Sequence, residues 1–316
     1  MPQKSSLELQ QVGNYPSSTM FGFLNIHKPV GPTSQGVIRI IKRQLPKGIR
    51  IGHAGTLDPF AQGVLVVCLG WACRLAHFVH SASKTYRTGI ILGSVSDTDD
   101  CMGQITPVSS RVPSADEIER AVLCQTGTIS QVPPAHSAVH VDGERAYTLA
   151  RQGQVLNLSP RVVTVHAITV LQYAYPLLEL EITCASGTYI RSIARDIGQL
   201  LQCGGYCQRL TRTRVGPFAL ENAIHADKVI LPQDLISPLA ALEHVPRIPL
   251  SDAQAAKVRM GQRIVLDGAS QSCEVALLDA QGNVLAIAVV QADGRTIQPT
   301  RVFVDTNAAG NNKDGR

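Results

Sequence analysis

A single carboxylate, Asp58, stands in a turn whose residue types suit a reactive loop. The segment reads Gly52-His53-Ala54-Gly55-Thr56-Leu57-Asp58-Pro59-Phe60-Ala61-Gln62-Gly63-Val64 and leads into the apolar run from Val64 to Leu69. Pro59 fixes its own φ and favours extended backbone at Asp58. The three glycines permit tight turns or the close approach of a large partner. An acid on a loop above a buried element is a common catalytic arrangement, although an aspartate in such a turn also serves as a helix cap.

Three further groups of polar residues could take part in chemistry or binding. Tyr86, in Ser83-Lys84-Thr85-Tyr86-Arg87, begins an expected strand, where a tyrosine either packs or takes a catalytic role. Acids stand at positions 97, 99 and 100, a cluster that a Ca²⁺ loop could use, but no Asp or Glu follows at EF-hand spacing. Five arginines against one acid lie between Arg191 and Gly216, which suits either phosphate contacts or a solvated face.

Composition indicates a soluble intracellular protein of two domains. The chain has 316 residues, is 44% hydrophobic and carries a formal charge of +5, a mild basic excess that fits an anionic partner. Its eight cysteines form no Cys-x-x-Cys pair and are expected to be free thiols in a reducing compartment. The first 19 residues lack the apolar core of a signal peptide, and no apolar run is long enough to span a bilayer. We therefore expect a cytoplasmic protein without a bound metal.

Strands and helices alternate without a regular βαβ rhythm, which predicts an α+β fold with a mixed, largely antiparallel sheet flanked by helices. A strand is expected at 20–26, followed by a helix after Ser34 that buries Val37, Ile40 and Ile41 and exposes Arg39, Lys42 and Arg43. A strand at 86–92, a helix at 114–125 opened by a capping box, and an antiparallel pair at 162–170 and 177–185 follow.

Beyond a boundary near residues 243–249 the pattern changes to short strands. A capped helix is expected at 251–260, with strands at 263–266, 274–278, 284–290 and 301–304. About 60 residues of this kind indicate a small β-barrel-like domain.

The Asp58 segment resembles the catalytic motif of the TruB-type tRNA pseudouridine synthases, GH-[TA]-G-x-LDP-x-A-x-G-[VM]-L. The resemblance implies that Asp58 is the catalytic aspartate and that His53 lies in the RNA-binding cleft. Tyr86 matches the family tyrosine that stacks on the target base. Arg191, in Gly187-Thr188-Tyr189-Ile190-Arg191, matches the arginine that contacts the aspartate, and Asp100 matches the acid that bonds the same arginine.

Further residues are expected to face the substrate. Leu210 matches an apolar family position against the base, and packing is an equally good explanation of it. Lys84 and Arg87 would supply positive charge near the phosphates, and solvated surface charges are the alternative. Arg212 belongs to the basic stretch that suits phosphate contacts and is expected to bind the substrate.

The same resemblance divides the chain and implies its substrate. It gives a catalytic domain at 20–244 with an RNA-gripping insertion at about 131–160, and a PUA-type RNA-binding domain at 245–305. The residue types at 1–19 and 306–316 predict disordered tails. His140 replaces a lysine that is usual in the insertion. The implied reaction is the isomerisation of uridine 55 in the T-stem-loop of tRNA by a stand-alone monomer, without cofactor, metal, membrane, guide RNA or protein partner.

Two rival functions are considered. An RNA-binding or RNA-folding protein would keep the basic residues but would not need Asp58. A hydrolase would need a second acid at a fixed separation, for which Asp100 is the only nearby candidate.

Overall fold

The computed structural model describes residues 20–137, 140–141, 144–145, 149, 152, 157–266 and 273–303. The two expected tails lie outside these residues, and so do 13 of the 30 residues of the expected insertion and the side chain of His140. Among the described residues, no helix has both the length and the apolar character to cross a membrane.

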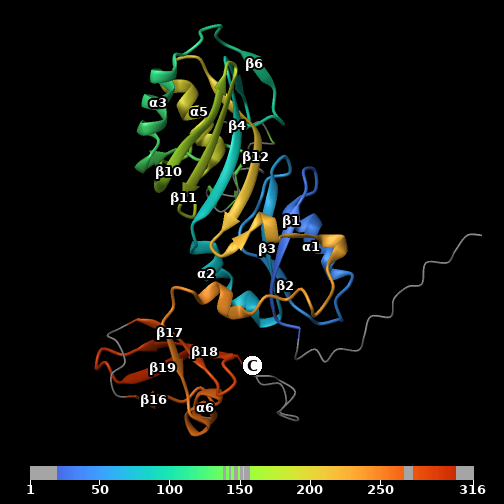
Figure 1. Cartoon of the computed structure of the whole chain (residues 1–316), viewed down its shortest axis with the longest axis vertical. Helices are drawn as coiled ribbons and strands as arrows, with labels where there is room; N and C mark the ends of the chain where they lie inside the picture. Colours follow the sequence, from blue (N-terminus) through green and yellow to red (C-terminus); the bar gives the residue numbers. More distant parts are fainter. Residues whose placement is uncertain are drawn as a thin grey trace, which may run out of the picture.

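Ten strands form the main sheet, in the order β14-β1-β3-β12-β4-β11-β10-β7, with β2 beside β3 and β13 beside β12 (Figure 1). All neighbours run antiparallel except the pairs β1–β14 and β3–β12, which confirms the predicted mixed, largely antiparallel sheet. The strands are β1 (Gly22–Lys28), β2 (Ile51–His53), β3 (Gln62–Leu69), β4 (Lys84–Leu92), β7 (Gly127–Gln131), β10 (Arg161–Ala174), β11 (Leu177–Cys184), β12 (Gly205–Val215), β13 (Phe218–Ala219) and β14 (Ile224–His225).

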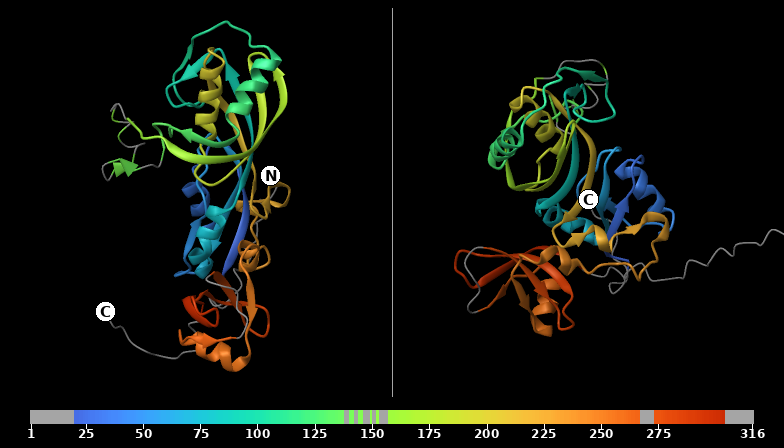
Figure 2. Two further views of the ribbon diagram at one scale, coloured as in Figure 1. Left: turned by 90° about the vertical axis from the view of Figure 1, so that its left-hand side faces the viewer. Right: turned by 45° about the horizontal axis from the view of Figure 1, so that its top comes forward.

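Short helices cover this sheet, and α3 and α5 lie together against one end of it (Figure 2). They are α1 (Ser34–Lys42), η2 (Gly70–Leu75), α2 (Ala76–Ser81), α3 (Ala115–Cys124), α5 (Ile190–Leu200), η3 (Leu220–Asn222), η4 (Ala226–Lys228) and η5 (Pro238–Leu242). Two small hairpins complete the region: β5 (Ser94–Ser96) with β6 (Ile105–Pro107), and β8 (His140–Val141) with β9 (Glu144–Arg145). The predicted capping box of α3 is confirmed, because Ser114 and Glu117 bond one another's backbone.

Helix α1 differs in one respect from its prediction. Val37 and Ile41 are buried as expected, but Ile38 is buried as well, and Ile40 is 39% exposed. The apolar face that packs on β1 and β3 is therefore centred on the positions i, i+1 and i+4, which leaves Ile40 at its edge.

A second sheet lies below the first and contains five strands, in the order β15-β17-β18-β19-β16 (Figure 1). Its elements are β15 (Arg247–Pro249), α6 (Asp252–Arg259), β16 (Ile264–Val265), β17 (Glu274–Leu278), β18 (Val284–Val290) and β19 (Thr296–Val302). It is joined to the main sheet by stacking of Trp71 on Phe303, with ring centroids 4.8 Å apart, and by a 2.9 Å hydrogen bond from Arg74 to the carbonyl of Val302. The curled sheet confirms the predicted small β-barrel-like domain.

Candidate active site

One arginine joins two carboxylates at the centre of the main sheet. Nε of Arg191 lies 3.1 Å from Oδ2 of Asp58, and Nη1 of Arg191 lies 3.1 Å from Oδ2 of Asp100. The side chains of Arg191 and Asp100 are only 5% and 7% exposed, whereas that of Asp58 is 35% exposed. Of the three charged groups, Asp58 is therefore the one that a substrate can reach.

Helix α5 positions this arginine. Ile190, Ile193, Ala194, Ile197 and Leu201 are all buried, as their helical spacing predicted. Arg191 follows the N-cap Tyr189 and sits in the first turn. Its remaining donors bond the carbonyls of Thr98, at 3.2 Å, and His136, at 2.9 Å. The guanidinium is held from several sides, which fixes the direction in which it presents Nε to Asp58.

The loop that carries Asp58 is fastened to its surroundings by buried polar groups. Ser34 Oγ donates to the carbonyl of Leu57, at 3.0 Å, and accepts from its amide, at 2.9 Å. Lys28 is completely buried, and its Nζ donates to the carbonyl of Ala61 at 2.6 Å. The sequence analysis missed both residues, although a lysine two residues beyond the expected apolar strand was a signal that could have been read.

Arg212 fastens the same loop from the side of β12. Its guanidinium donates to the carbonyls of Gly55, Thr56 and Val64, at 3.0, 3.3 and 2.8 Å. Gly63 is the point of closest approach, with φ at +107°, and a Cβ placed there would lie 2.2 Å from the carbonyl oxygen of Arg212. Only glycine fits this backbone conformation and this contact.

These contacts overturn two expectations about phosphate binding. Arg212 is 2% exposed and its donors bond backbone carbonyls. Lys84 is 5% exposed, and its Nζ donates to the carbonyls of His80 and Ala82, so it caps the C-terminal end of α2. A cation that contacts a phosphate in solvent must be accessible. Both residues therefore support the site from within, and their expected phosphate contact is wrong.

The remaining predicted residues line the site from neighbouring strands. Tyr86 on β4 is half-buried and packs on the same core as Leu57 and Leu210. Leu210 is itself buried, which agrees with packing as its role. His53 ends β2, and its Nδ1 is buried without a hydrogen-bond partner in the described part of the chain.

Burial shifts the protonation of several of these groups. It raises the pKa of Asp58 above the ordinary value, although the positive charges of Arg191 and Lys28 act in the opposite direction. Burial also raises the pKa of the Tyr86 hydroxyl, which favours the protonated phenol at neutral pH. Burial and the nearby Arg212 lower the pKa of His53, so its imidazole is neutral at pH 7.

The three acids of the 97–100 turn bond three separate partners. Asp97 accepts from the amide of Gln104 at 2.8 Å, Asp99 pairs with Arg195 at 3.0 Å, and Asp100 pairs with Arg191. Among the described residues, no three His, Cys, Asp or Glu side chains gather as metal ligands would. The arrangement of the acids therefore does not support the Ca²⁺ alternative.

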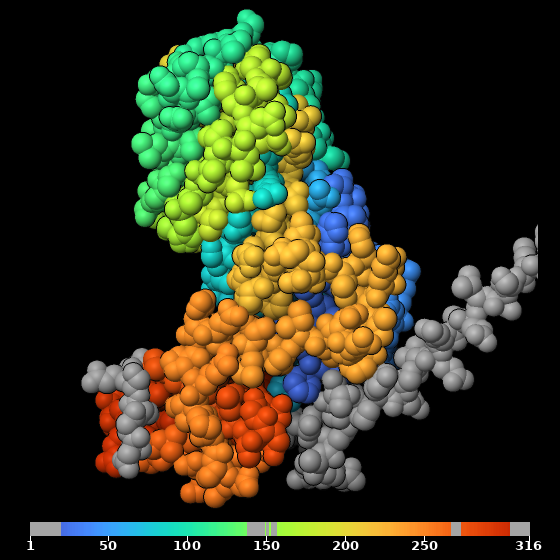
Figure 3. Space-filling view, in the orientation of Figure 1, coloured from blue at the N-terminus to red at the C-terminus, as the bar shows by residue number. Residues whose placement is uncertain are grey.

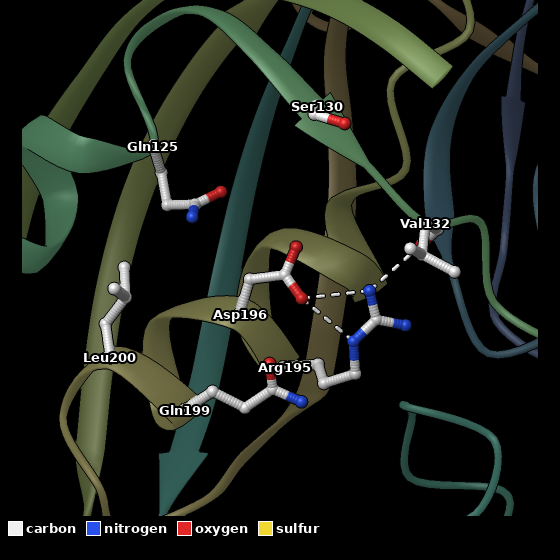
Figure 4. Close-up of a pocket in the computed structure, with 7 residues that line it drawn as sticks. All are labelled: Gln125, Ser130, Val132, Arg195, Asp196, Gln199 and Leu200. Atoms are coloured by element: carbon white, nitrogen blue, oxygen red, sulfur yellow. Dashed lines mark hydrogen bonds and ion pairs between the residues drawn. The ribbon is translucent and has the colours of Figure 1, made fainter. Parts of the chain in front are cut away.

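A separate hollow of about 630 Å³ lies beside α5, one helical turn beyond Arg191. The side chain of Arg195 lines this hollow and donates hydrogen bonds to Asp196 and to the carbonyl of Val132 (Figure 4). Asp58 is not among the lining residues, which are Gln125, Ser130, Val132, Arg195, Asp196, Gln199 and Leu200. This hollow is therefore not the site of the accessible carboxylate.

Comparison with known proteins agrees with this geometry. Three family models match in succession: the TruB family pseudouridylate synthase N-terminal domain over residues 42–190, the tRNA pseudouridylate synthase B C-terminal domain over 191–235, and the pseudouridine synthase II TruB C-terminal domain over 246–303. The tRNA pseudouridine synthase B of Syntrophomonas wolfei is 38% identical over 295 residues, covering 90% of this chain and 99% of that one. The enzyme of the same name from Gloeobacter violaceus is 45% identical over 255 residues, covering 78% and 87%.

Solved structures share the fold. A chain of a Cbf5-Nop10-Gar1 complex superposes with a TM-score of 0.69 at 25% identity, covering 93% of this chain and 88% of that one. A chain of the archaeal box H/ACA sRNP Nop10-Cbf5 complex gives 0.66 at 23% identity, covering 94% and 93%. The sheet, the C-terminal domain and the family matches together define a pseudouridylate synthase. Within that class, the chain belongs to the TruB family.

Proposed function

We propose that this protein converts uridine 55 in the T loop of tRNA to pseudouridine, with Asp58 as the catalytic residue. The observation that carries the proposal is the position of Asp58, an accessible carboxylate held by a buried arginine that a second, buried carboxylate also holds. The relatives named tRNA pseudouridine synthase B support tRNA as the substrate. The T-loop position rests on the resemblance of the catalytic motif.

The reaction is an isomerisation, so its atoms balance without a co-reactant. The bond between N1 of uracil and C1′ of ribose breaks, the base turns, and C5 bonds to C1′. The proton on C5 is lost to solvent, and N1 takes up a proton. The target nucleotide must first leave the RNA stack to reach the site.

The residues around Asp58 suit this sequence of events. The carboxylate would cleave the N1–C1′ bond by attacking C1′ or by removing a proton from the sugar, and both routes need its ionised form. Arg191 orients the carboxylate and favours its ionisation. Tyr86 offers a ring on which the detached uracil can stack, and Leu210 packs beneath it. The neutral His53 would contact the RNA at the edge of the site.

We infer that the chain acts directly on tRNA as a monomer, without a guide RNA or a protein partner. The solved Cbf5 structures are titled as complexes with Nop10, or with Nop10 and Gar1. The curated relatives named for tRNA are 38% and 45% identical to this chain, against 25% and 23% for the two Cbf5 chains. That higher identity supports a stand-alone enzyme.

The engagement of Asp100 argues against the hydrolase alternative. A pair of acids that shares the cleavage of a glycosidic bond needs both carboxyl groups at the substrate. Asp100 is buried, and its oxygens accept from Arg191, Thr98 and the amide of Met102.

The test is release of tritium from tRNA labelled at uracil C5, without added metal, by the wild-type protein and by Asp58→Asn. The wild type should release one equivalent per tRNA, and none when uridine 55 is replaced by cytidine. Asp58→Asn should bind tRNA normally and release none, because the amide keeps the shape but not the charge.

Asp97→Asn is the matched control, since Asp97 is exposed and an asparagine oxygen can still accept from Gln104. It should retain the wild-type rate. A folded wild type that binds tRNA without releasing tritium would overturn the proposal in favour of the RNA-binding alternative. Release from tRNA that carries cytidine 55 would refute the assigned position.

A further inference from the structure

Residues 39–50 carry a concentrated positive charge that the catalytic site does not use. This segment is the second half of α1 and the chain that follows it. No Asp or Glu occurs between Pro29 and Leu57. The five cations of the segment are all exposed. They are Arg39, Lys42, Arg43, Lys47 and Arg50.

None of these five side chains has a hydrogen bond or an ion pair within the described part of the chain. Three other exposed arginines differ in this respect. Arg87, Arg209 and Arg214 are paired with Glu181, Glu179 and Glu221 respectively. An ion pair neutralises much of the field that a cation presents to a distant anion, whereas an unpaired cation presents all of it. Residues 39–50 therefore present a stronger positive field to solvent than the paired arginines Arg87, Arg209 and Arg214 do.

The helix dipole accounts for only part of this charge. Arg39 and Lys42 lie in the last turn of α1, where a cation is favoured. Lys47 and Arg50 lie beyond the helix, where the dipole gives them no such advantage. The apolar face of α1 packs on the main sheet, and the charged residues are exposed, with no bonded side-chain partner among the described residues.

Helix α1, whose second half belongs to this segment, is fastened to the catalytic loop at the N-terminal end of the helix. Ser34, the first residue of α1, exchanges two hydrogen bonds with Leu57, and the amide of Gly31 donates to the carbonyl of Pro59. At its other end the chain enters β2, which finishes at His53. A helix of nine residues is about 13 Å long. Arg39, the first cation of the segment, therefore lies within the length of this helix from Ser34, whose partner Leu57 precedes Asp58 in the chain.

We propose that Arg39, Lys42, Arg43, Lys47 and Arg50 form a phosphate-binding surface for the RNA whose uridine enters the site. The proposal rests on the function proposed above and extends it to RNA outside the reacting loop. Nucleic acid backbone carries closely spaced negative charges, and each phosphate that a cation neutralises releases counterions. The surface would thus contribute to binding and orientation of the RNA, without touching the reacting atoms.

The experiment compares two triple variants with equal change of charge. Arg39→Gln, Lys42→Gln and Arg43→Gln together remove three unpaired cations. The control combines Arg87→Gln, Arg209→Gln and Arg214→Gln, which removes three paired ones. The Kd is measured against salt concentration with tRNA carrying cytidine at position 55, so that binding is read without turnover. Tritium release from tRNA with uridine 55 is measured separately.

The unpaired triple should raise the Kd at physiological salt roughly tenfold or more and reduce the slope of log Kd against log salt by about two. Its kcat at saturating tRNA should stay within about twofold of the wild type, because the substrate still reaches an intact Asp58. The control should leave the Kd and the slope nearly unchanged. Equal losses in both triples, or no loss in the first, would overturn the proposal. If the wild type releases no tritium, and only the variant with three unpaired cations removed binds tRNA more weakly, the proposed reaction is refuted and the proposed phosphate-binding surface is supported.

Discussion

Residues 191–214 and residues 39–50 each carry five cationic side chains, and the fold uses them in opposite ways. Each arginine of the first segment bonds a carboxylate or a carbonyl of the protein itself. The cations of the second segment point outward and have no such partner in the described residues. Arg191 and Arg212 of the first segment hold Asp58 and its loop, whereas the second segment is free to attract an anion. A basic stretch in a sequence therefore does not by itself identify where a nucleic acid binds.

Among substitutions that test this contrast between the two segments, the largest loss of activity is expected at Arg191. Arg191→Gln removes a buried guanidinium and leaves Asp58 and Asp100 facing each other without it, which should lower kcat about a hundredfold or more. Loss of a buried pair should also cost about 3–5 kcal/mol of stability. Single-turnover rates and thermal unfolding measure the two effects separately. Arg191→Lys keeps the positive charge but loses the planar guanidinium, whose separate donors reach Asp58 and Asp100. Full activity of this variant would contradict the role of Arg191 in orienting Asp58.

Arg212 should show the next largest effect, mainly on stability. Arg212→Gln leaves buried carbonyls of the catalytic loop without a donor, at about 1–3 kcal/mol for each unpaired group. Thermal unfolding should show a Tm several degrees lower. Arg214→Gln, two residues along the same strand, is the control, because Arg214 is exposed and its partner Glu221 is exposed as well. Equal changes of Tm in the two variants would refute the distinction between inward and outward arginines.

The pH dependence of kcat/KM should reveal the charges around Asp58. Because its pKa is raised, the ionised form is lost, and activity with it, as the pH falls through a value above that of an ordinary aspartate. The negative charge of Asp100 contributes to raising this pKa. In Asp100→Asn the acidic limb of the profile should therefore move to lower pH, even where the rate is reduced. A limb that stays in place would show that Asp100 does not act electrostatically on Asp58.

The smallest effect on the folded state is expected in the outward segment. Lys47→Gln with Arg50→Gln should change the free energy of unfolding by less than about 0.5 kcal/mol, since both residues are exposed and unpaired. Urea denaturation measures this change. A large loss of stability would show that these two residues have a structural role and would remove them from the proposed phosphate surface.

Much of the fold followed from local patterns. The capping box before Ala115 and the alternating or apolar runs at 274–278 and 284–290 predicted their elements with the bounds that the structure has. Each of these signals depends on residues within one helical turn or one strand. The placement of β12 between β3 and β4 was not predicted, because it depends on pairing between strands that are far apart in the chain.

The residues of the candidate site also divide into those that the sequence predicted and those that it did not. Three separate segments, matched to the family, identified Asp58, Arg191 and Asp100, and the structure brings these residues together. The destinations of Lys84 and Arg212 were predicted wrongly, because a cationic residue type does not reveal whether its partner is a phosphate or a carbonyl. The carbonyl of Val64 that Arg212 bonds is 148 residues away in the chain. Only the packing of β3 against β12 makes that contact possible.

The contact at Gly63 has a consequence for how the gene can vary. A side chain at position 63 would meet backbone atoms of Arg212 at 2.2–2.9 Å, and backbone atoms cannot turn aside as a flexible side chain can. Gly52, in the same motif, has open space around its Cα. In a saturation library selected for function, codons other than glycine should disappear at position 63 and persist at position 52. Replacement of Gly63 would require a simultaneous shift of strand β12, which no single nucleotide change provides.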